Sequence, residues 1–185
     1  MTVEELALPG VRLLTRAMHR DRRGVLSEVF KGPELQAMGI SGFVQDNLTR
    51  STRHVVRGLH WQVQRPQGKL VTVVRGAIVD VVVDVRKGSP TFGRSLTVAL
   101  DDASGHQLWI PPGYAHGFCV VSDVADVLYK NTDVWVPGDG RGVRWNCPTL
   151  AIHWPTAHPI LSDKDAALPM LGELSPSDLP AVDLP

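Results

Sequence analysis

The chain has 185 residues, which is enough for one domain with a sizeable hydrophobic core. Lysine plus arginine and aspartate plus glutamate both number 19, so no net charge favours nucleic acid or an anionic membrane. The first residues, MTVEELALPG, lack the apolar stretch of a secretory signal, and no run approaches the about 18 apolar residues that span a bilayer. We therefore expect a cytoplasmic protein that binds neither nucleic acid nor membranes.

Short strands dominate the predicted secondary structure after one short helix at residues 32–39 (GPELQAMG). The valine-rich stretch 69–86 predicts two strands, and Gly76 between them suits a hairpin turn. In the second of these strands Asp80 and Asp84 stand among valines, which is close to the alternation of a strand with one solvent-facing side.

The rest of the chain continues this pattern of short segments separated by Gly, Pro or Asp. Further strands are expected at residues 95–100, 107–110, 117–121 and 125–131. Strands at this spacing predict an all-β sandwich or barrel. The segment SDKDAALPML predicts a second short helix, for which Ser162 is a suitable N-cap. We expect one domain over residues 1–171 and an irregular, Pro-rich tail over residues 172–185.

The spacing of the second cupin motif, G(x)5PxG(x)2H, is present near the middle of the chain. It runs from Gly105 through Pro111 and Gly113 to His116, and only Val120 departs, because the motif places Asn there. The match predicts a cupin-type double-stranded β-helix, which is a jelly-roll barrel with a few short helices.

The first cupin motif is matched only loosely, and its departures decide against a metal. His60 holds the first ligand position, but Gln62 replaces the second His and Lys69 replaces the Glu. A catalytic metal centre typically needs three protein ligands, and an ammonium repels a cation. The two cysteines, Cys119 and Cys147, are too few for a zinc cluster, and Cys119 in the run FCVV is expected to be a buried thiol. We expect no metal and no other cofactor.

A cation fixed in a dry pocket stabilises a developing oxyanion, which forms when a proton leaves carbon beside a ketone. His60 can take such a proton, because histidine acts as a base near neutral pH. Tyr129 can return a proton to the opposite face of the carbon. The alternatives are that His60 is a hydrogen-bonded core histidine and that Tyr129 only fills the barrel mouth.

The chain resembles the dTDP-4-dehydrorhamnose 3,5-epimerase family over residues 10–170. The matching segments are DRRGVLSEVF at 21–30, QDN at 45–47, VRGLHWQ at 56–62, QGKLV at 67–71, DVVVDVRKGSPTFG at 80–93, LWIPPGYAHGF at 108–118, LYKNTD at 128–133, RWNCP at 144–148 and, between 154 and 165, WP and PILSDKD.

The resemblance implies a role for each matched side chain. His60 is implied as the general base with Asp165 as its partner, Lys69 as the cation beside the C4 oxygen, Tyr129 as the proton donor and His116 as a pocket histidine near the sugar. Contacts to the diphosphate and to adjoining parts of a nucleotide-sugar substrate are implied for Gln45, Asn47, Arg57 and Lys164.

The family resemblance also implies a homodimer. Arg23 and Glu28 match residues that reach into the neighbouring subunit's site. The chain departs from the family at three positions: His19 replaces a Phe, and Val134 and Trp135 each replace a Tyr. Trp135 keeps a stacking face near the substrate but loses the phenol, so the nucleotide base and the number of inverted carbons stay open.

The expected activity is epimerisation at C3 and C5 of dTDP-4-dehydro-6-deoxy-D-glucose to give dTDP-4-dehydro-L-rhamnose. Three alternatives remain: a mono-epimerase acting at C3 or C5 of a modified nucleotide sugar, an isomerase that moves the ketone from C4 to C3, and a sugar-nucleotide-binding cupin that is non-catalytic or metal-dependent.

Overall fold

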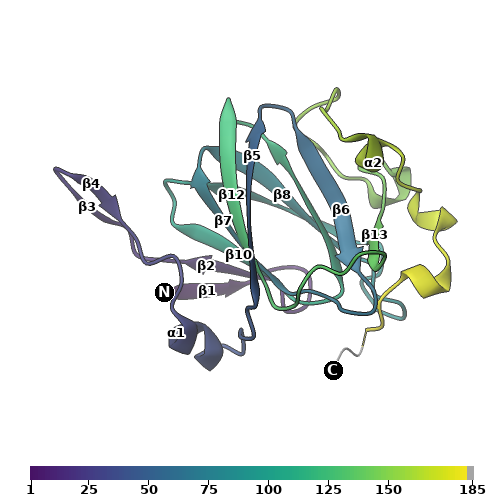
Figure 1. The fold of residues 1–185 in the computed structure, drawn as a ribbon, viewed down its shortest axis with the longest axis horizontal. Coiled ribbons are helices and arrows are strands. Elements are labelled where there is room, and N and C mark those ends of the chain that lie inside the picture. The colour runs from purple at the N-terminus through teal and green to yellow at the C-terminus, as the bar shows by residue number, and fades with distance from the viewer. Residues whose placement is uncertain (183–185) are drawn as a thin grey trace.

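The computed structural model describes residues 1–182, and two antiparallel sheets that face each other form its body (Figure 1). The six-stranded sheet has the order β1 (Thr2–Glu5), β2 (Arg12–Thr15), β10 (His106–Ile110), β7 (Lys69–Arg75), β12 (Val124–Asn131) and β5 (Gln45–Thr52). The five-stranded sheet has the order β13 (Gly140–Gly142), β6 (Val56–Gln62), β11 (Tyr114–Val120), β8 (Ala77–Asp84) and β9 (Ser95–Asp101).

From β5 to β13 the chain passes repeatedly between the two sheets, so that most consecutive strands lie on opposite walls of a jelly-roll barrel. Apolar side chains from both walls pack together in its interior, among them Val71 and Val127 on one wall and Val82 and Phe118 on the other. The predicted all-β barrel is therefore confirmed. Strand β11 begins at Tyr114, earlier than predicted, because Tyr114–His116 already pair with β8.

The hairpin predicted at Gly76 is wrong. Strands β7 and β8 lie in different sheets, so Gly76 is the corner at which the chain crosses from one wall to the other. Its φ is +79°, and a Cβ there would lie 2.2 Å from the Val124 carbonyl oxygen, so only glycine fits this corner without strain.

The solvent-facing side predicted for β8 is also wrong, because Asp80 and Asp84 are fully buried. Strand β8 is an inner strand, and its outer face, including Val81, is covered by a second apolar cluster to which the C-terminal part of the chain contributes Leu150 and Met170. Asp84 is satisfied by hydrogen bonds from neighbouring side chains, namely Arg86, Ser89 and Thr91.

Both predicted helices form, as α1 (Gly32–Ala37) and α2 (Asp163–Ala166), and the Ser162 hydroxyl caps α2 by accepting a hydrogen bond from the Asp165 N–H. Of the predicted tail, residues 183–185 lie outside the described residues. The part before them packs on the barrel: the Trp61 indole donates to the Asp178 carbonyl oxygen at 2.8 Å. The division at residue 171 stays a prediction.

Cys119 is buried as predicted, and burial raises the pKa of its thiol to about 11. Across residues 1–182, no helix has the length and apolar character needed to cross a membrane.

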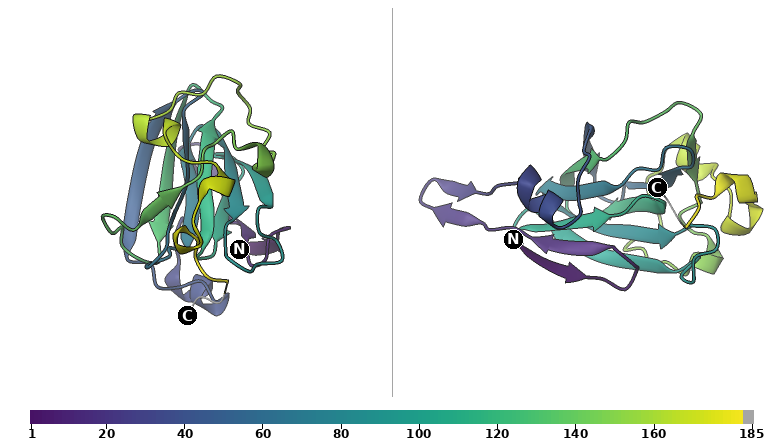
Figure 2. Two further views of the ribbon diagram at one scale, coloured as in Figure 1. Left: turned by 90° about the vertical axis from the view of Figure 1, so that its right-hand side faces the viewer. Right: turned by 90° about the horizontal axis from the view of Figure 1, so that it is seen from below.

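A two-stranded hairpin, β3 (His19–Asp21) and β4 (Gly24–Leu26), extends away from the two sheets (Figures 1 and 2). Every residue of both strands is exposed, including Val25 and Leu26, which is 73% exposed. Exposed apolar side chains on a projecting hairpin indicate a contact with another molecule.

Candidate active site

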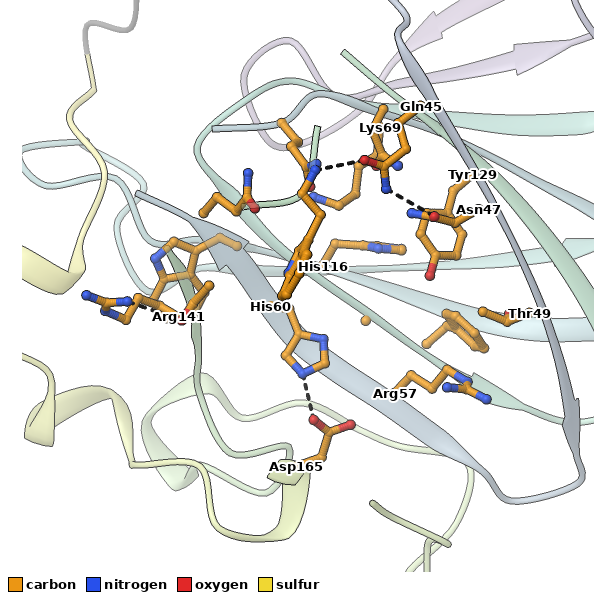
Figure 3. A pocket seen from close by; sticks show the side chains of 18 of the residues that line it. Gln45, Asn47, Thr49, Arg57, His60, Lys69, His116, Tyr129, Arg141 and Asp165 are labelled. Carbon is orange, nitrogen blue, oxygen red and sulfur yellow. Dashed lines mark hydrogen bonds and ion pairs between the residues drawn. The ribbon is translucent and has the colours of Figure 1, made fainter. Parts of the chain in front are cut away.

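A cavity of about 680 Å³ opens between the two sheets (Figure 3). We call it the barrel pocket. Its principal lining residues are Gln45, Asn47, Thr49, Arg57, His60, Gln62, Gln67, Lys69, His116, Phe118, Tyr129, Asn131, Trp135, Arg141, Lys164 and Asp165. All the site residues expected from the sequence are among them except Arg23 and Glu28.

His60 and Asp165 form a hydrogen-bonded pair in this pocket, with 2.6 Å between the imidazole Nε2 and the carboxylate Oδ1. Burial acts to raise the pKa of Asp165, but hydrogen bonds from His60 and from the Gly58 N–H outweigh it and lower the pKa. Asp165 is therefore a carboxylate, which can only accept, so the proton lies on His60 Nε2. The other ring nitrogen, Nδ1, faces the open space of the pocket and is free to act as a base (Figure 3).

The backbone around Gly58 brings this pair together. Gly58 has φ +117°, and a Cβ there would lie 2.6 Å from the Cα of Gly117 on the neighbouring strand. The close approach of β6 to β11 places the Gly58 N–H 3.3 Å from Asp165 Oδ2. Glycine at both positions therefore lets the strands approach closely enough to hold the Asp165 carboxylate against His60.

Lys69 lies on the opposite wall, at the start of β7, with only 8% of the residue exposed. Burial lowers the pKa of its ammonium to about 8. Among residues 1–182 no hydrogen bond or ion pair to Nζ is formed, so the cation has nothing to neutralise it. An uncompensated buried ammonium in a polar pocket is suited to an anion or to an oxygen that becomes negative during a reaction.

Tyr129 lies on the same wall as Lys69, on β12, whereas His60 lies on the other wall. Burial raises the pKa of its phenol, although the charge of Arg57 acts in the opposite direction. The phenol therefore keeps its proton at neutral pH. A molecule bound between the two sheets would meet a base on one face and a proton donor on the other.

A second histidine–carboxylate pair lies deeper in the pocket. His116 is the cross-strand partner of His60, and its Nε2 lies 2.8 Å from Oδ2 of Asp80. Burial raises the pKa of Asp80, and His116 opposes that effect. The ring of His116 packs edge-on against Tyr129, with 6.5 Å between the ring centroids. This pair fixes the orientation of His116 beneath the reacting space.

Cationic and amide side chains surround the mouth of the pocket. Arg57 and Lys164 are exposed and line it from β6 and α2. Gln45 and Asn47 are two residues apart on β5, and the Gln45 amide donates to Asn47 Oδ1 at 3.1 Å. Two cations beside amide groups are suited to a diphosphate.

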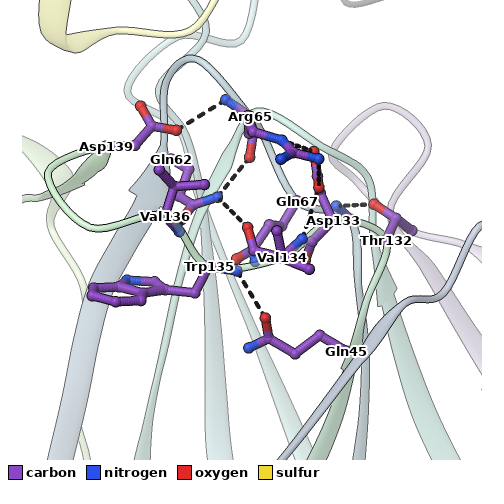
Figure 4. A network of polar contacts seen from close by, with 11 residues as sticks. Gln45, Gln62, Arg65, Gln67, Thr132, Asp133, Val134, Trp135, Val136 and Asp139 are labelled. Carbon is purple, nitrogen blue, oxygen red and sulfur yellow. Dashed lines mark hydrogen bonds and ion pairs between the residues drawn. The ribbon is translucent and has the colours of Figure 1, made fainter.

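Trp135 lines the mouth from a loop that polar contacts hold in place (Figure 4). Its N–H donates to Gln45 Oε1 at 2.8 Å, and its side chain is 57% exposed. Gln62 fixes both neighbours of Trp135: its Nε2 donates to the Val134 carbonyl oxygen at 3.1 Å, and its Oε1 accepts from the Val136 N–H at 2.7 Å. The indole is thus presented to a ligand by a rigid loop.

Arg23 and Glu28 do not reach this pocket. Arg23 follows β3 in the projecting hairpin and pairs with Asp21 at 2.6 Å, and Glu28 lies just after the hairpin, 3.6 Å from Lys31. That they serve a neighbouring subunit stays a prediction.

Several lining residues were not singled out from the sequence, namely Thr49, Gln67, Asn131 and Arg141. Thr49 and Asn131 alternate with outward-facing residues on β5 and β12, so the period of two around Asn47 and Tyr129 is the signal that would have found them. Arg141 comes from the short strand β13, which no pattern predicted. Within residues 1–182, no three His, Cys, Asp or Glu side chains gather as a metal site would require.

Comparison with known proteins identifies the family. The family model described as dTDP-4-dehydrorhamnose 3,5-epimerase matches residues 5–173. A protein of that description from Neisseria gonorrhoeae is 45% identical over 90% of this chain, which spans 52% of that relative's length. A dTDP-4-dehydrorhamnose 3-epimerase from Streptomyces niveus is 40% identical, over 94% of this chain and 85% of the relative.

Among solved structures, the 3,5-epimerase RmlC from Legionella pneumophila, in complex with dTDP-4-keto-L-rhamnose, is 40% identical. It has a TM-score of 0.95, and the match covers 99% of each chain. The likeness confirms the predicted cupin-type fold. The two facing sheets, the pocket between them and these matches along nearly the whole chain lead to one conclusion: the chain belongs to the dTDP-4-dehydrorhamnose 3,5-epimerase family.

Proposed function

We propose that the protein epimerises C3 and C5 of dTDP-4-dehydro-6-deoxy-D-glucose, giving dTDP-4-dehydro-L-rhamnose. The observation that carries the proposal is that the base and the proton donor lie on opposite walls of the barrel pocket. A histidine–carboxylate pair, His60 and Asp165, lies on one side, and a buried, unneutralised Lys69 lies with Tyr129 on the other. Such a pocket favours removal of a proton beside a ketone and its replacement from the opposite face.

The proposed reaction has two proton transfers at each carbon. His60 Nδ1 takes the proton, and the electron pair moves through the forming C=C bond onto the C4 oxygen, which becomes an enolate oxygen. The ammonium of Lys69 stabilises that negative charge. The Tyr129 hydroxyl then gives its proton to the opposite face of the carbon as the C4 ketone re-forms. Exchange with solvent returns His60 and Tyr129 to their starting protonation states.

The mouth of the pocket provides the groups that a nucleoside diphosphate needs. We infer that Arg57 and Lys164 bind the diphosphate, that Gln45 and Asn47 bind adjoining oxygens, and that Trp135 stacks on the base. The exposed indole face supports the last assignment. His116 orients the sugar from below. The proposed site of action is the cytoplasm.

We further propose that the enzyme works as a homodimer in which the projecting hairpin crosses to the partner. Arg23 and Glu28 would then complete the neighbouring barrel pocket. The exposed Val25 and Leu26 of the hairpin support this arrangement, because they would be buried against a second chain.

Solvent exchange tests the proposed reaction directly. The protein is incubated in D₂O with synthetic dTDP-4-dehydro-6-deoxy-D-glucose, and NMR follows deuterium at C3 and C5. We expect incorporation at both carbons and an L-rhamno product. The variant His60→Asn should lose exchange while dTDP still binds, and exchange that persists in this variant would remove His60 as the base. A 3-keto sugar as the product would favour a ketone-moving isomerase.

A mono-epimerase is the second candidate, and Trp135 is the observation that favours it. The family resemblance places a tyrosine at this position, and the indole has no phenol with which to transfer a proton. The 3-epimerase from Streptomyces niveus, at 40% identity, is a relative with that narrower activity in its name. Deuterium at one carbon only would establish this alternative.

A further inference from the structure

Asn131 is a buried polar side chain of the barrel pocket with no partner among the described residues. It is 1% exposed, and neither its Oδ1 nor its Nδ2 makes a hydrogen bond. It ends β12, two residues after Tyr129, and so shares the face of the strand that lines the pocket. Lys130 between them faces the other way and pairs with Asp46. Buried polar groups are nearly always hydrogen-bonded. An amide unpaired on both atoms at an open pocket therefore indicates a ligand that supplies the missing hydrogen-bond partner.

The neighbours of Asn131 narrow the choice of that ligand. Its cross-strand partners are Lys69 on β7 and Gln45 on β5, which gives a row of three polar side chains along one level of the sheet. The Gln45 amide is already engaged, because it donates to Asn47 and accepts from the Trp135 N–H. Asn131 and Lys69 are therefore the members of this row that are free to bind a substrate.

We propose that Asn131 is a further catalytic residue, whose Nδ2 donates a hydrogen bond to the C4 oxygen of the sugar beside the Lys69 ammonium. This assignment rests on the proposed function. Directly opposed residues on adjacent strands have Cβ atoms about 5 Å apart, so their donors can converge on one oxygen. The side-chain amide is a donor that does not titrate, so unlike the ammonium it donates at every working pH.

The proposal makes a prediction that other contacts of Asn131 would not make. The C4 oxygen carries the negative charge whichever carbon loses its proton. Loss of a donor to that oxygen must therefore slow exchange at C3 and at C5 by the same factor. A contact to a ring hydroxyl would instead affect one carbon more than the other, and a contact to the diphosphate would weaken binding of the nucleotide alone.

The test variant is Asn131→Leu, which has a similar shape and no hydrogen-bonding group. We expect deuterium exchange at both carbons to fall by a common factor of about 100 to 1,000, with the dissociation constant for dTDP changed less than about threefold. Lys130→Gln, one residue away on the outer face of β12, is the matched control and should exchange as the wild type does. Melting temperatures of both variants establish that they are folded.

A second variant, Asn131→Asp, keeps the proposal testable if the leucine variant does not fold. It keeps the shape, removes the donor and places a carboxylate beside Lys69, which raises the lysine pKa. We expect an equal loss at both carbons and an alkaline limit of activity that moves to higher pH. Unequal loss, unchanged exchange or weakened dTDP binding would overturn the assignment. Absence of exchange in the wild type would instead refute the proposed function.

Discussion

The hydrogen bond between Asp165 and His60 fixes which imidazole nitrogen faces the substrate. In Asp165→Asn the side-chain amide can present its N–H to the ring, so the tautomer with Nδ1 free is no longer favoured. We expect solvent exchange to fall about 100-fold or more while dTDP binding is kept. NMR in D₂O measures the first and titration calorimetry the second. Asp163→Asn, on the exposed face of the same helix, is the control. Equal rates in the two variants would mean that Asp165 does not orient the base.

We expect the buried ammonium of Lys69 to lower the free energy of unfolding, although the reaction requires it. Its pKa is lowered from 10.5 to about 8 by burial, so between these two pH values the unfolded chain holds more protons than the folded one. The free energy of unfolding therefore rises with pH across that window. At pH 7 the folded state carries the full penalty, and Lys69→Met should raise the free energy of unfolding by about 3 kcal/mol while abolishing exchange. Denaturant titrations at pH 7 and above pH 10 measure the difference, which should shrink at the higher pH. A less stable methionine variant at pH 7 would contradict the burial penalty.

At the scale of elements, a buried amide from β6, that of Gln62, holds both neighbours of Trp135 in its loop. Gln62→Leu removes the side-chain partner of the Val136 N–H and of the Val134 and Arg65 carbonyl oxygens. Each lost hydrogen bond costs about 0.5–1.5 kcal/mol. The loop should loosen and the indole lose its fixed position. We expect dTDP to bind about tenfold more weakly, by calorimetry, with a smaller change in kcat. Gln64→Leu, exposed and close by, is the control. Unchanged affinity would show that the loop does not position the base.

The elements also show which parts of the site follow from the sequence. Motif spacing located His60 and His116, and these residues are partners on neighbouring strands. The corner at Gly76 and the burial of Asp80 were mispredicted, because both depend on which sheet a strand joins and on what later covers it. Asp165 lies 105 residues from His60, a separation that no local pattern encodes, so only the family resemblance identified it.

At the scale of the whole molecule, the proposed dimer makes each barrel pocket depend on two chains. The single chain contains His60 in its own pocket and Arg23 on a hairpin outside it, so the two residues would act in different sites of one dimer. Leu26→Asp, at the base of the hairpin opposite His19, should therefore give a monomer by analytical ultracentrifugation and lose activity although His60 is intact, because a buried charge opposes the contact.

Mixing two inactive variants tests the shared site without disrupting the interface. In Arg23→Ala each pocket lacks the partner's arginine, and in His60→Asn each pocket lacks its base. After denaturation together and refolding, a heterodimer contains one pocket with both defects and one with neither, because the intact His60 receives Arg23 from the other chain. With equal amounts of the two variants, half of the dimers are mixed. Each mixed dimer has one intact pocket of two, so about a quarter of the wild-type activity should return. No recovery from variants that do form mixed dimers would mean that Arg23 serves its own chain, and the hairpin would then have to fold back toward its own barrel pocket.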